Sequence, residues 1–116
     1  MNILIVDDSV LLQDRLKKTL TEVNKNISVS LACNCKEALD LFTLHLYDKI
    51  ILDIDLPDGS GIQLLRLFKK SKPETDVIMF TNYPSTEFKK NCIDLGANHF
   101  FNKSEMAGLI KTISPF

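Results

Sequence analysis

The feature that most constrains the fold of this chain is a regular alternation of short apolar runs with longer amphipathic segments. Five apolar runs have the length of β-strands and are bounded by turn or polar residues: "NILIV" (2–6), "ISVSLA" (27–32), "KIILD" (49–53), "DVIMF" (76–80) and "NHFF" (98–101). Strands that alternate with helices form βαβ units, which build a parallel sheet through right-handed crossovers. We therefore expect an α/β fold, a doubly wound parallel sheet of five strands.

The first two segments between the runs carry helix signals. In the first, apolar residues recur on one helical face: Leu12, Leu16, Leu20 and Val23. In the second, Asn34 and Glu37 have the spacing of an N-cap residue and its capping-box partner. We expect the apolar stripe of this second helix from Ala38, Leu41 and Leu46. Both segments are thus predicted to be helices that pack one face against the sheet.

The remaining segments also predict helices. Ser60 and Gln63 repeat the capping-box spacing before an apolar stripe of Leu64, Leu65 and Phe68. This helix should stop at Lys72-Pro73, because the residue before a proline disfavours helical backbone. A fourth helix is marked by Phe88, Cys92 and Leu95, and Gly96 suits the residue just past its end. A short fifth helix is predicted over 104–113.

Length and composition limit the class of protein. At 116 residues the chain is expected to form one domain over 1–116. No apolar run approaches the roughly 20 residues of a membrane span, and Met1 precedes the first strand too closely for a signal peptide, so we expect a cytoplasmic protein. The 14 basic and 15 acidic residues include no basic block, which argues against direct nucleic-acid binding.

Three cysteines, Cys33, Cys35 and Cys92, are an odd number for a disulfide framework. A zinc site would show two cysteine pairs, or a pair with two histidines, at characteristic spacing, and "CNC" stands alone. We predict free thiols, with Cys92 in the core of its helix.

Polar residues follow four of the predicted strands at the ends where open α/β sheets carry their function. The first strand ends in Asp7 and Asp8, the third in Asp53 and the fourth in Thr81, and Lys103 follows the fifth. Because the carboxyl ends of parallel strands meet at one edge of the sheet, we expect these five side chains to converge.

Three carboxylates at one edge require a cation, because two of them ~4 Å apart repel by about 4 kcal/mol at an effective dielectric constant of 20. Mg²⁺ suits them best, since it takes oxygen ligands, retains several waters and shares phosphate oxygens. A calcium loop beginning at Asp53 is rejected, because Pro57 and Leu64 would then stand at ligand positions. The sequence therefore predicts a site where Mg²⁺ and a phosphoryl group meet Asp53.

Over essentially its whole length, the chain resembles the receiver domain of two-component response regulators. The resemblance lies in "ILIVDDS", "IILDIDLPDGSGIQLL", "VIMFTNYP" and "LGANHFFNK", in this order and spacing. It implies a flavodoxin-like (βα)5 fold with strand order 2-1-3-4-5.

The resemblance also implies roles for the acidic residues. Asp53 would be the phosphorylated residue, and Asp8 would bind Mg²⁺ directly. Asp7 would act mostly through a metal-bound water, and Asp55 would contribute its backbone carbonyl as a ligand.

Further implied roles concern the phosphoryl group and the output. Thr81 and Lys103 would hydrogen-bond the phosphoryl oxygens, and Phe100 falls where the family has its switch aromatic. The phosphoryl donor would be a phosphohistidine of a histidine kinase or a histidine phosphotransfer protein. The face made by the fourth helix, the fifth strand and the fifth helix would then control a downstream effector domain or protein, or form a homodimer. Such a domain catalyses only its own phosphoryl transfer and slow dephosphorylation.

The sequence departs from the family pattern at a few positions. Ser104 replaces the usual proline after the lysine, so the resemblance does not carry over the cis peptide bond expected there, which costs several kcal/mol without proline. Phe100 lacks a hydroxyl, so its switching would depend on packing alone. Asn82 is larger than the small residue common after the threonine, and Tyr83 follows it. We predict that these two side chains hinder the attacking water and prolong the aspartyl phosphate.

Two other functions fit parts of the sequence. "ILDIDLPDGS" also resembles the D-x-D motif of haloacid-dehalogenase-type aspartyl phosphatases, but in that family the motif comes first and the acidic pair last, whereas here Asp7 and Asp8 precede it. The other alternative is an interaction module that keeps the fold and works without phosphorylation.

Overall fold

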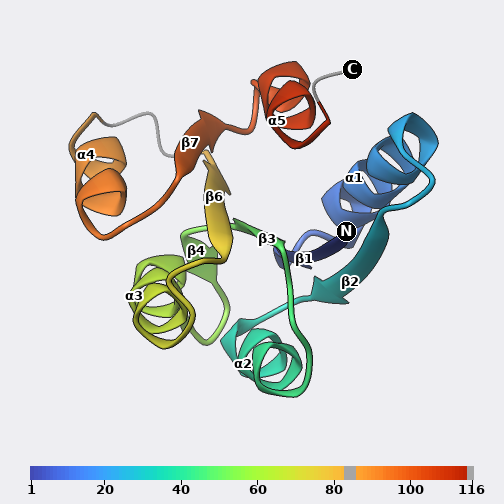
Figure 1. The fold of residues 1–116 in the computed structure, drawn as a ribbon. Coiled ribbons are helices and arrows are strands. Elements are labelled where there is room, and N and C mark those ends of the chain that lie inside the picture. The colour runs from blue at the N-terminus through green and yellow to red at the C-terminus, as the bar shows by residue number, and fades with distance from the viewer. Residues whose placement is uncertain (83–85, 115–116) are drawn as a thin grey trace.

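The computed structural model describes residues 1–82 and 86–114 and centres on a five-stranded parallel sheet (Figure 1). Its strands, in spatial order, are β2 (Ser28–Ala32), β1 (Asn2–Val6), β3 (Lys49–Leu52), β6 (Asp76–Thr81) and β7 (His99–Asn102). Counted along the chain within this sheet, the order is 2-1-3-4-5, as predicted. The labels differ because a separate antiparallel hairpin of β4 (Asp55–Leu56) and β5 (Gly59–Ser60) follows β3.

Helices cover both faces of the sheet (Figure 1). On one face lie α1 (Val10–Val23) and α5 (Met106–Ile113), and on the other α2 (Cys35–Leu44), α3 (Gly61–Ser71) and α4 (Thr86–Asp94). Successive strand side chains point to opposite faces. Ile5 therefore packs with the α1 and α5 side chains, whereas its neighbour Leu4 packs with those of α2 and α3. The doubly wound α/β fold is confirmed.

The predicted helix caps are largely present. Asn34 accepts a hydrogen bond from the Glu37 backbone N–H at 2.8 Å, but the Glu37 carboxylate bonds the N–H of Cys33 rather than that of Asn34. Ser60 caps α3 through the N–H of Ile62, one residue earlier than the Gln63 spacing predicted. Gly96 has a φ of 106° just past α4, as expected for a glycine that ends a helix.

Two element boundaries differ from prediction. Helix α2 ends at Leu44 because the chain must turn into β3, so Leu46 is 73% exposed and Tyr47 takes the core position instead. Helix α5 begins at Met106 rather than Ser104. The Asn102 side chain accepts the N–H of Ser104, and the Glu105 carboxylate accepts the N–H of Asn102, so this segment forms a turn instead.

The other general expectations concern the cysteines and membranes. The three cysteines are free thiols, and Cys92 is fully buried on α4. Within residues 1–82 and 86–114, no helix combines the length and the apolar character that crossing a membrane requires.

Candidate functional site

The register of the sheet brings two acidic residues together. Val6 of β1 pairs with Leu52 of β3, so Asp7 and Asp53 leave the sheet side by side. The backbone N–H of Asp53 donates to the Val6 carbonyl at 3.0 Å, and that of Asp7 donates to the Ala32 carbonyl at 3.0 Å. The hydrogen bonding between neighbouring strands thus continues one residue beyond β1 and β3, to Asp7 and Asp53.

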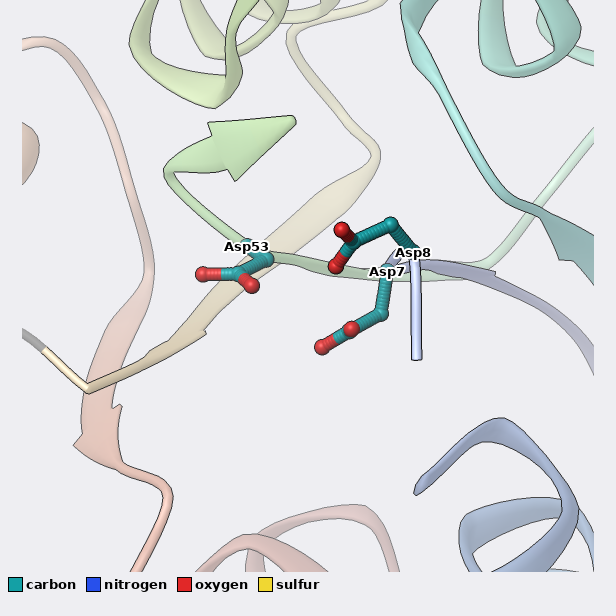
Figure 2. Close-up of side chains that lie close together, drawn as sticks. All are labelled: Asp7, Asp8 and Asp53. Carbon is teal, nitrogen blue, oxygen red and sulfur yellow. The ribbon is translucent and has the colours of Figure 1, made fainter. Parts of the chain in front are cut away.

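Asp7, Asp8 and Asp53 form an acidic cluster (Figure 2). One carboxylate oxygen from each residue lies within 4.8 Å of the other two. Asp7 and Asp53 are buried, and Asp8 is exposed. The cluster therefore combines negative charge with restricted access to water.

Lys103 provides the positive charge of the cluster. Its Nζ lies 2.9 Å from Asp7 Oδ2 and 2.9 Å from Asp53 Oδ2. The backbone N–H of Lys103 donates to the Thr81 carbonyl at 2.9 Å, which holds the residue just beyond the β6–β7 pairing. The structure thus brings Asp7, Asp8, Asp53 and Lys103 together from the ends of three strands, and the fourth strand end, at Thr81, contacts Lys103 through its backbone carbonyl.

Burial and neighbouring charges shift the pKa values of Asp7 and Lys103. Burial raises the pKa of Asp7 and the charge of Asp53 adds to the rise, although hydrogen bonds from Lys103 and Ser9 oppose it. Burial lowers the pKa of Lys103, but its hydrogen bonds to Asp7 and Asp53 outweigh that effect and raise it overall. The raised pKa of Asp7 and the raised pKa of Lys103 are both consistent with an excess of negative charge around one ammonium group.

Thr81 lies at the end of β6, and its hydroxyl has no partner among the residues that the structure describes. The residue is 1% exposed, and its Oγ1 makes no hydrogen bond within the described part of the chain. A buried polar group without a partner costs about 1–3 kcal/mol. Such a cost at the carboxyl end of β6 suits a group that bonds a ligand.

The loop after Asp53 is held close to the start of α3. Asp53 Oδ1 accepts the N–H of Ile54 at 2.8 Å, which leaves Oδ2 to Lys103. The N–H of Gly61 donates to the Ile54 carbonyl at 2.7 Å, and a Cβ on Gly61 would lie 1.8 Å from the Asp53 carbonyl oxygen. Only glycine allows this close approach, a role that the sequence pattern did not single out.

The other predicted residues lie around the cluster. Asp55 is exposed in β4, and its role as a carbonyl ligand stays a prediction. Asn82 is exposed next to Thr81, and Tyr83 lies outside the described residues. Among the described residues there is no cis peptide bond, so the peptide between Lys103 and Ser104 is trans.

Phe100 is half-buried and packs against the core cluster on the α2–α3–α4 side of the sheet. It pairs with Met79 in the β6–β7 register, and side chains two residues apart share a face. Phe100 and Thr81 therefore lie on the same face of the sheet.

Two polar residues make specific contacts that the sequence pattern did not single out. Asp58 accepts the backbone N–H groups of Cys35 at 2.7 Å and Lys36 at 3.1 Å, which lowers its pKa and holds the hairpin to α2. Gln13 of α1 is buried and donates to the carbonyls of Asp7 and Ala32. The signal for Gln13 was a polar residue on the face of α1 that carries Leu16 and Leu20.

The fold and this site define a class of protein, and comparison with known families agrees. The sequence model of the response regulator receiver domain family matches residues 3–114 of this chain. The chain therefore belongs to the receiver domains of two-component response regulators, which serve in signalling rather than as enzymes. The haloacid-dehalogenase alternative is set aside.

Individual relatives extend this finding. The chain is 33% identical over 103 residues to the transcriptional regulatory protein DltR of Streptococcus agalactiae, covering 89% of this chain and 45% of DltR. It is 32% identical over 110 residues to the response regulator protein PilR of Pseudomonas aeruginosa, covering 95% of this chain and 24% of PilR. The chain thus spans less than half the length of these two relatives.

Solved structures show the same fold. A CheY-like receiver domain protein from Methanospirillum hungatei matches with a TM-score of 0.89 and 30% identity, covering 98% of this chain and 90% of that one. The response regulator TrrA from Thermotoga maritima, solved in complex with Mg²⁺ and BeF, matches with a TM-score of 0.85 and 29% identity, covering 98% and 96% of the two chains.

Proposed function

We propose that residues 1–116 form one receiver domain in which Asp53 accepts a phosphoryl group from a phosphohistidine of a histidine kinase or a histidine phosphotransfer protein. The observation that carries the proposal is the placement of Lys103. Its ammonium group bridges Asp7 and Asp53 at 2.9 Å each, and it follows the strand that pairs with Thr81. A nucleophilic carboxylate, a cation and a hydroxyl donor are groups that can orient and stabilise a phosphoryl group in transfer.

The acidic cluster fits Mg²⁺. The three clustered carboxylates offer hard oxygen donors within 4.8 Å of one another, and one ammonium group leaves two of their three charges uncompensated. Asp8 and Asp53 would bind the ion directly, Asp7 mostly through a water, and Asp55 through its backbone carbonyl. When bound, Mg²⁺ would neutralise charge on the phosphoryl oxygens.

The protein groups have separate tasks in the transfer. The hydrogen bond from the Ile54 N–H to Oδ1 orients the Asp53 carboxylate. One oxygen of this carboxylate attacks the phosphorus, the P–N bond breaks and the donor imidazole leaves. Lys103 stabilises the charge on the transferred oxygens from the position where it now pairs with Asp53. The domain catalyses only this transfer and a slow hydrolysis of its product.

The output would be a shift between two conformations. The Thr81 hydroxyl gains the phosphoryl group as an acceptor, which draws the end of β6 towards the site. Phe100 lies on the same face of the sheet and would move into the space that Thr81 vacates, which remodels the surface of α4, β7 and α5. A downstream effector or a second copy of the domain would read that surface. Moving such an equilibrium from 1:99 to 99:1 takes about 5.5 kcal/mol.

The test is intact mass spectrometry after incubation with acetyl phosphate, with Mg²⁺ and with EDTA. We expect the parent to gain one phosphoryl group only with Mg²⁺, and Asp53→Asn to gain none. Asp40→Asn is the matched control, because Asp40 is an exposed carboxylate of α2 paired with Lys36 at 3.1 Å, and it should be modified like the parent. A mass gain in Asp53→Asn, or steady release of phosphate from an aryl phosphate, would contradict the proposal.

Partner binding tests the signalling half of the proposal. Phosphorylation should change the affinity of the α4–β7–α5 surface for its partner, and Asp53→Asn should abolish that change. Unchanged partner binding by Asp53→Asn under phosphorylating conditions would instead indicate an interaction module that works without phosphorylation.

A further inference from the structure

Gln13 is a buried polar residue in the second turn of α1, between this helix and the ends of β1 and β2. It is 2% exposed. Its Nε2 donates to the Asp7 carbonyl at 2.8 Å and to the Ala32 carbonyl at 2.9 Å, and its Oε1 lies 3.8 Å from the Cys33 thiol. Both amide N–H groups are therefore used on backbone carbonyls, which can only accept.

The Asp7 carbonyl belongs to the peptide group that joins the two acidic residues of the site. This peptide group is planar, so the direction of its oxygen also sets the direction in which the Asp8 backbone continues. The Ala32 carbonyl oxygen accepts from both the Asp7 N–H and the Gln13 amide. Through its second N–H group, Gln13 links this oxygen to the Asp7 carbonyl.

The two acidic side chains depend on this peptide to different degrees. The Asp7 carboxylate is also held by the Ser9 N–H at 2.9 Å and by Lys103 at 2.9 Å. The exposed Asp8 carboxylate makes no hydrogen bond or ion pair with the residues that the structure describes. The direction of the Asp8 side chain is therefore set mainly by its backbone, which Gln13 orients.

We propose that Gln13 is a positioning residue of the metal site: it fixes the Asp7–Asp8 peptide so that both carboxylates face the same Mg²⁺. This inference rests on the proposed function, because it assumes that the acidic cluster binds Mg²⁺. Groups that orient metal ligands typically contribute 10- to 100-fold to metal affinity. We expect removal of the amide to weaken Mg²⁺ binding about tenfold.

A purely structural role for Gln13 would lower stability without a specific effect on the metal. Thr75 provides the matched comparison at the opposite, amino ends of the strands, directly before β6. It is 3% exposed, and its hydroxyl donates to the Tyr47 carbonyl at 3.3 Å. Thr75→Val therefore also removes a buried hydrogen bond from a side chain to a backbone carbonyl, but far from the acidic cluster.

The experiment measures the Mg²⁺ dissociation constant by isothermal titration calorimetry on the 116-residue chain, together with urea unfolding. Gln13→Met keeps the approximate volume and removes both donors. Gln13→Asn is a second variant, since an amide shorter by one methylene cannot reach both carbonyls. Cys33→Ala removes the thiol near Oε1 and leaves both donors in place.

The expected result is a dissociation constant raised about tenfold in Gln13→Met and Gln13→Asn, and unchanged in Thr75→Val and Cys33→Ala. The phosphorylation rate at saturating Mg²⁺ should stay within about twofold of the parent, because the nucleophile Asp53 is untouched. If the parent binds Mg²⁺ and the Gln13 variants bind it equally well, or no more weakly than Thr75→Val, the inference about Gln13 is wrong. If the parent binds no Mg²⁺, the proposed function fails as well.

Discussion

The two ends of the parallel sheet each contain a lysine ion pair, and the pairs differ in their surroundings. At the amino ends of the strands, Lys49 of β3 contacts Asp76 of β6 at 2.9 Å, and the Asp76 side chain is 41% exposed. At the carboxyl ends, Lys103 contacts Asp7 and Asp53 at the same distance, and their side chains are only 4% and 7% exposed.

Equal distances therefore do not mean equal energies. The Lys49 pair balances one charge against another near water, where such a pair contributes little. Lys103 serves two buried carboxylates, with Asp8 a third nearby, so its removal leaves charge without compensation in a place that water hardly reaches. The amino end is arranged for folding, and the carboxyl end keeps an excess of negative charge that suits a ligand.

The largest expected difference between the ends comes from removing the lysines. In EDTA, Lys103→Met should lower the free energy of unfolding by about 3–5 kcal/mol, because two buried carboxylates lose their cation. Lys49→Met should lower it by less than about 1 kcal/mol. Urea unfolding of both variants measures the effect. Equal losses would show that the two ends do not differ in the way inferred here.

Within the carboxyl end, Gly61 at the start of α3 and Gly59 in the hairpin test how tightly the backbone is packed beside Asp53. Gly61→Ala should cost about 3 kcal/mol, since its Cβ would lie 1.8 Å from the Asp53 carbonyl oxygen and the backbone must move. Gly59→Ala is the control, because its Cβ would approach only the Cys35 thiol, at 3.2 Å. Thermal unfolding compares them, and phosphorylation should be impaired in Gly61→Ala alone. A Gly61→Ala variant as stable as Gly59→Ala would contradict the packing argument.

Neutralising one acidic residue should change the free energy of unfolding in opposite directions at the two ends of the sheet. Asp8→Asn in EDTA should raise the free energy of unfolding by about 1 kcal/mol, because it relieves repulsion within the acidic cluster. Asp76→Asn should lower it by about 0.5 kcal/mol through loss of the Lys49 pair. Saturating Mg²⁺ should stabilise the parent more than Asp8→Asn. If Asp8→Asn destabilises the protein in EDTA, the cluster is not under charge repulsion.

The last prediction concerns the lifetime of the phosphoryl group at the carboxyl end, with no expected change in stability. Asn82 is exposed directly after Thr81, where its side chain can hinder the attacking water. Asn82→Ala should speed decay of the aspartyl phosphate by less than about tenfold, which corresponds to under ~1.4 kcal/mol. Phosphate release after removal of the donor measures the decay, with Tyr83→Ala as a companion variant. Decay no faster than that of the parent would reject the idea.

Much of the fold could be predicted from local patterns. The five apolar runs match the five strands of the sheet, and the caps at Asn34 and Ser60 mark the starts of α2 and α3. The boundary at Leu46 was wrong because an apolar residue at helical spacing does not reveal that the chain has already left the helix. The start of α5 was wrong because the bonds of Asn102 and Glu105 form a turn that competes with helix at Ser104.

The candidate site was predictable in part. The convergence of Asp7, Asp53 and Lys103 follows from strand ends, because a parallel sheet places them at one edge. The roles of Gly61 and Gln13 could not be derived in this way. Gly61 is required because the Asp53 carbonyl comes close to it, and the contact of Gln13 depends on the position of the Asp7 carbonyl. The spacing of residues along the chain does not reveal where these backbone carbonyls lie.

By itself the sequence determined which segments become strands and helices, and it placed acids, a hydroxyl and an ammonium group at the ends of the strands, because periodicity and turn residues act locally. Tertiary structure alone decided that Lys103 is shared between two carboxylates, that the Thr81 hydroxyl has no partner among the described residues, and that Gln13 donates to the carbonyls of Asp7 and Ala32. These features depend on burial and on distances between different secondary-structure elements, which are fixed only when the core packs.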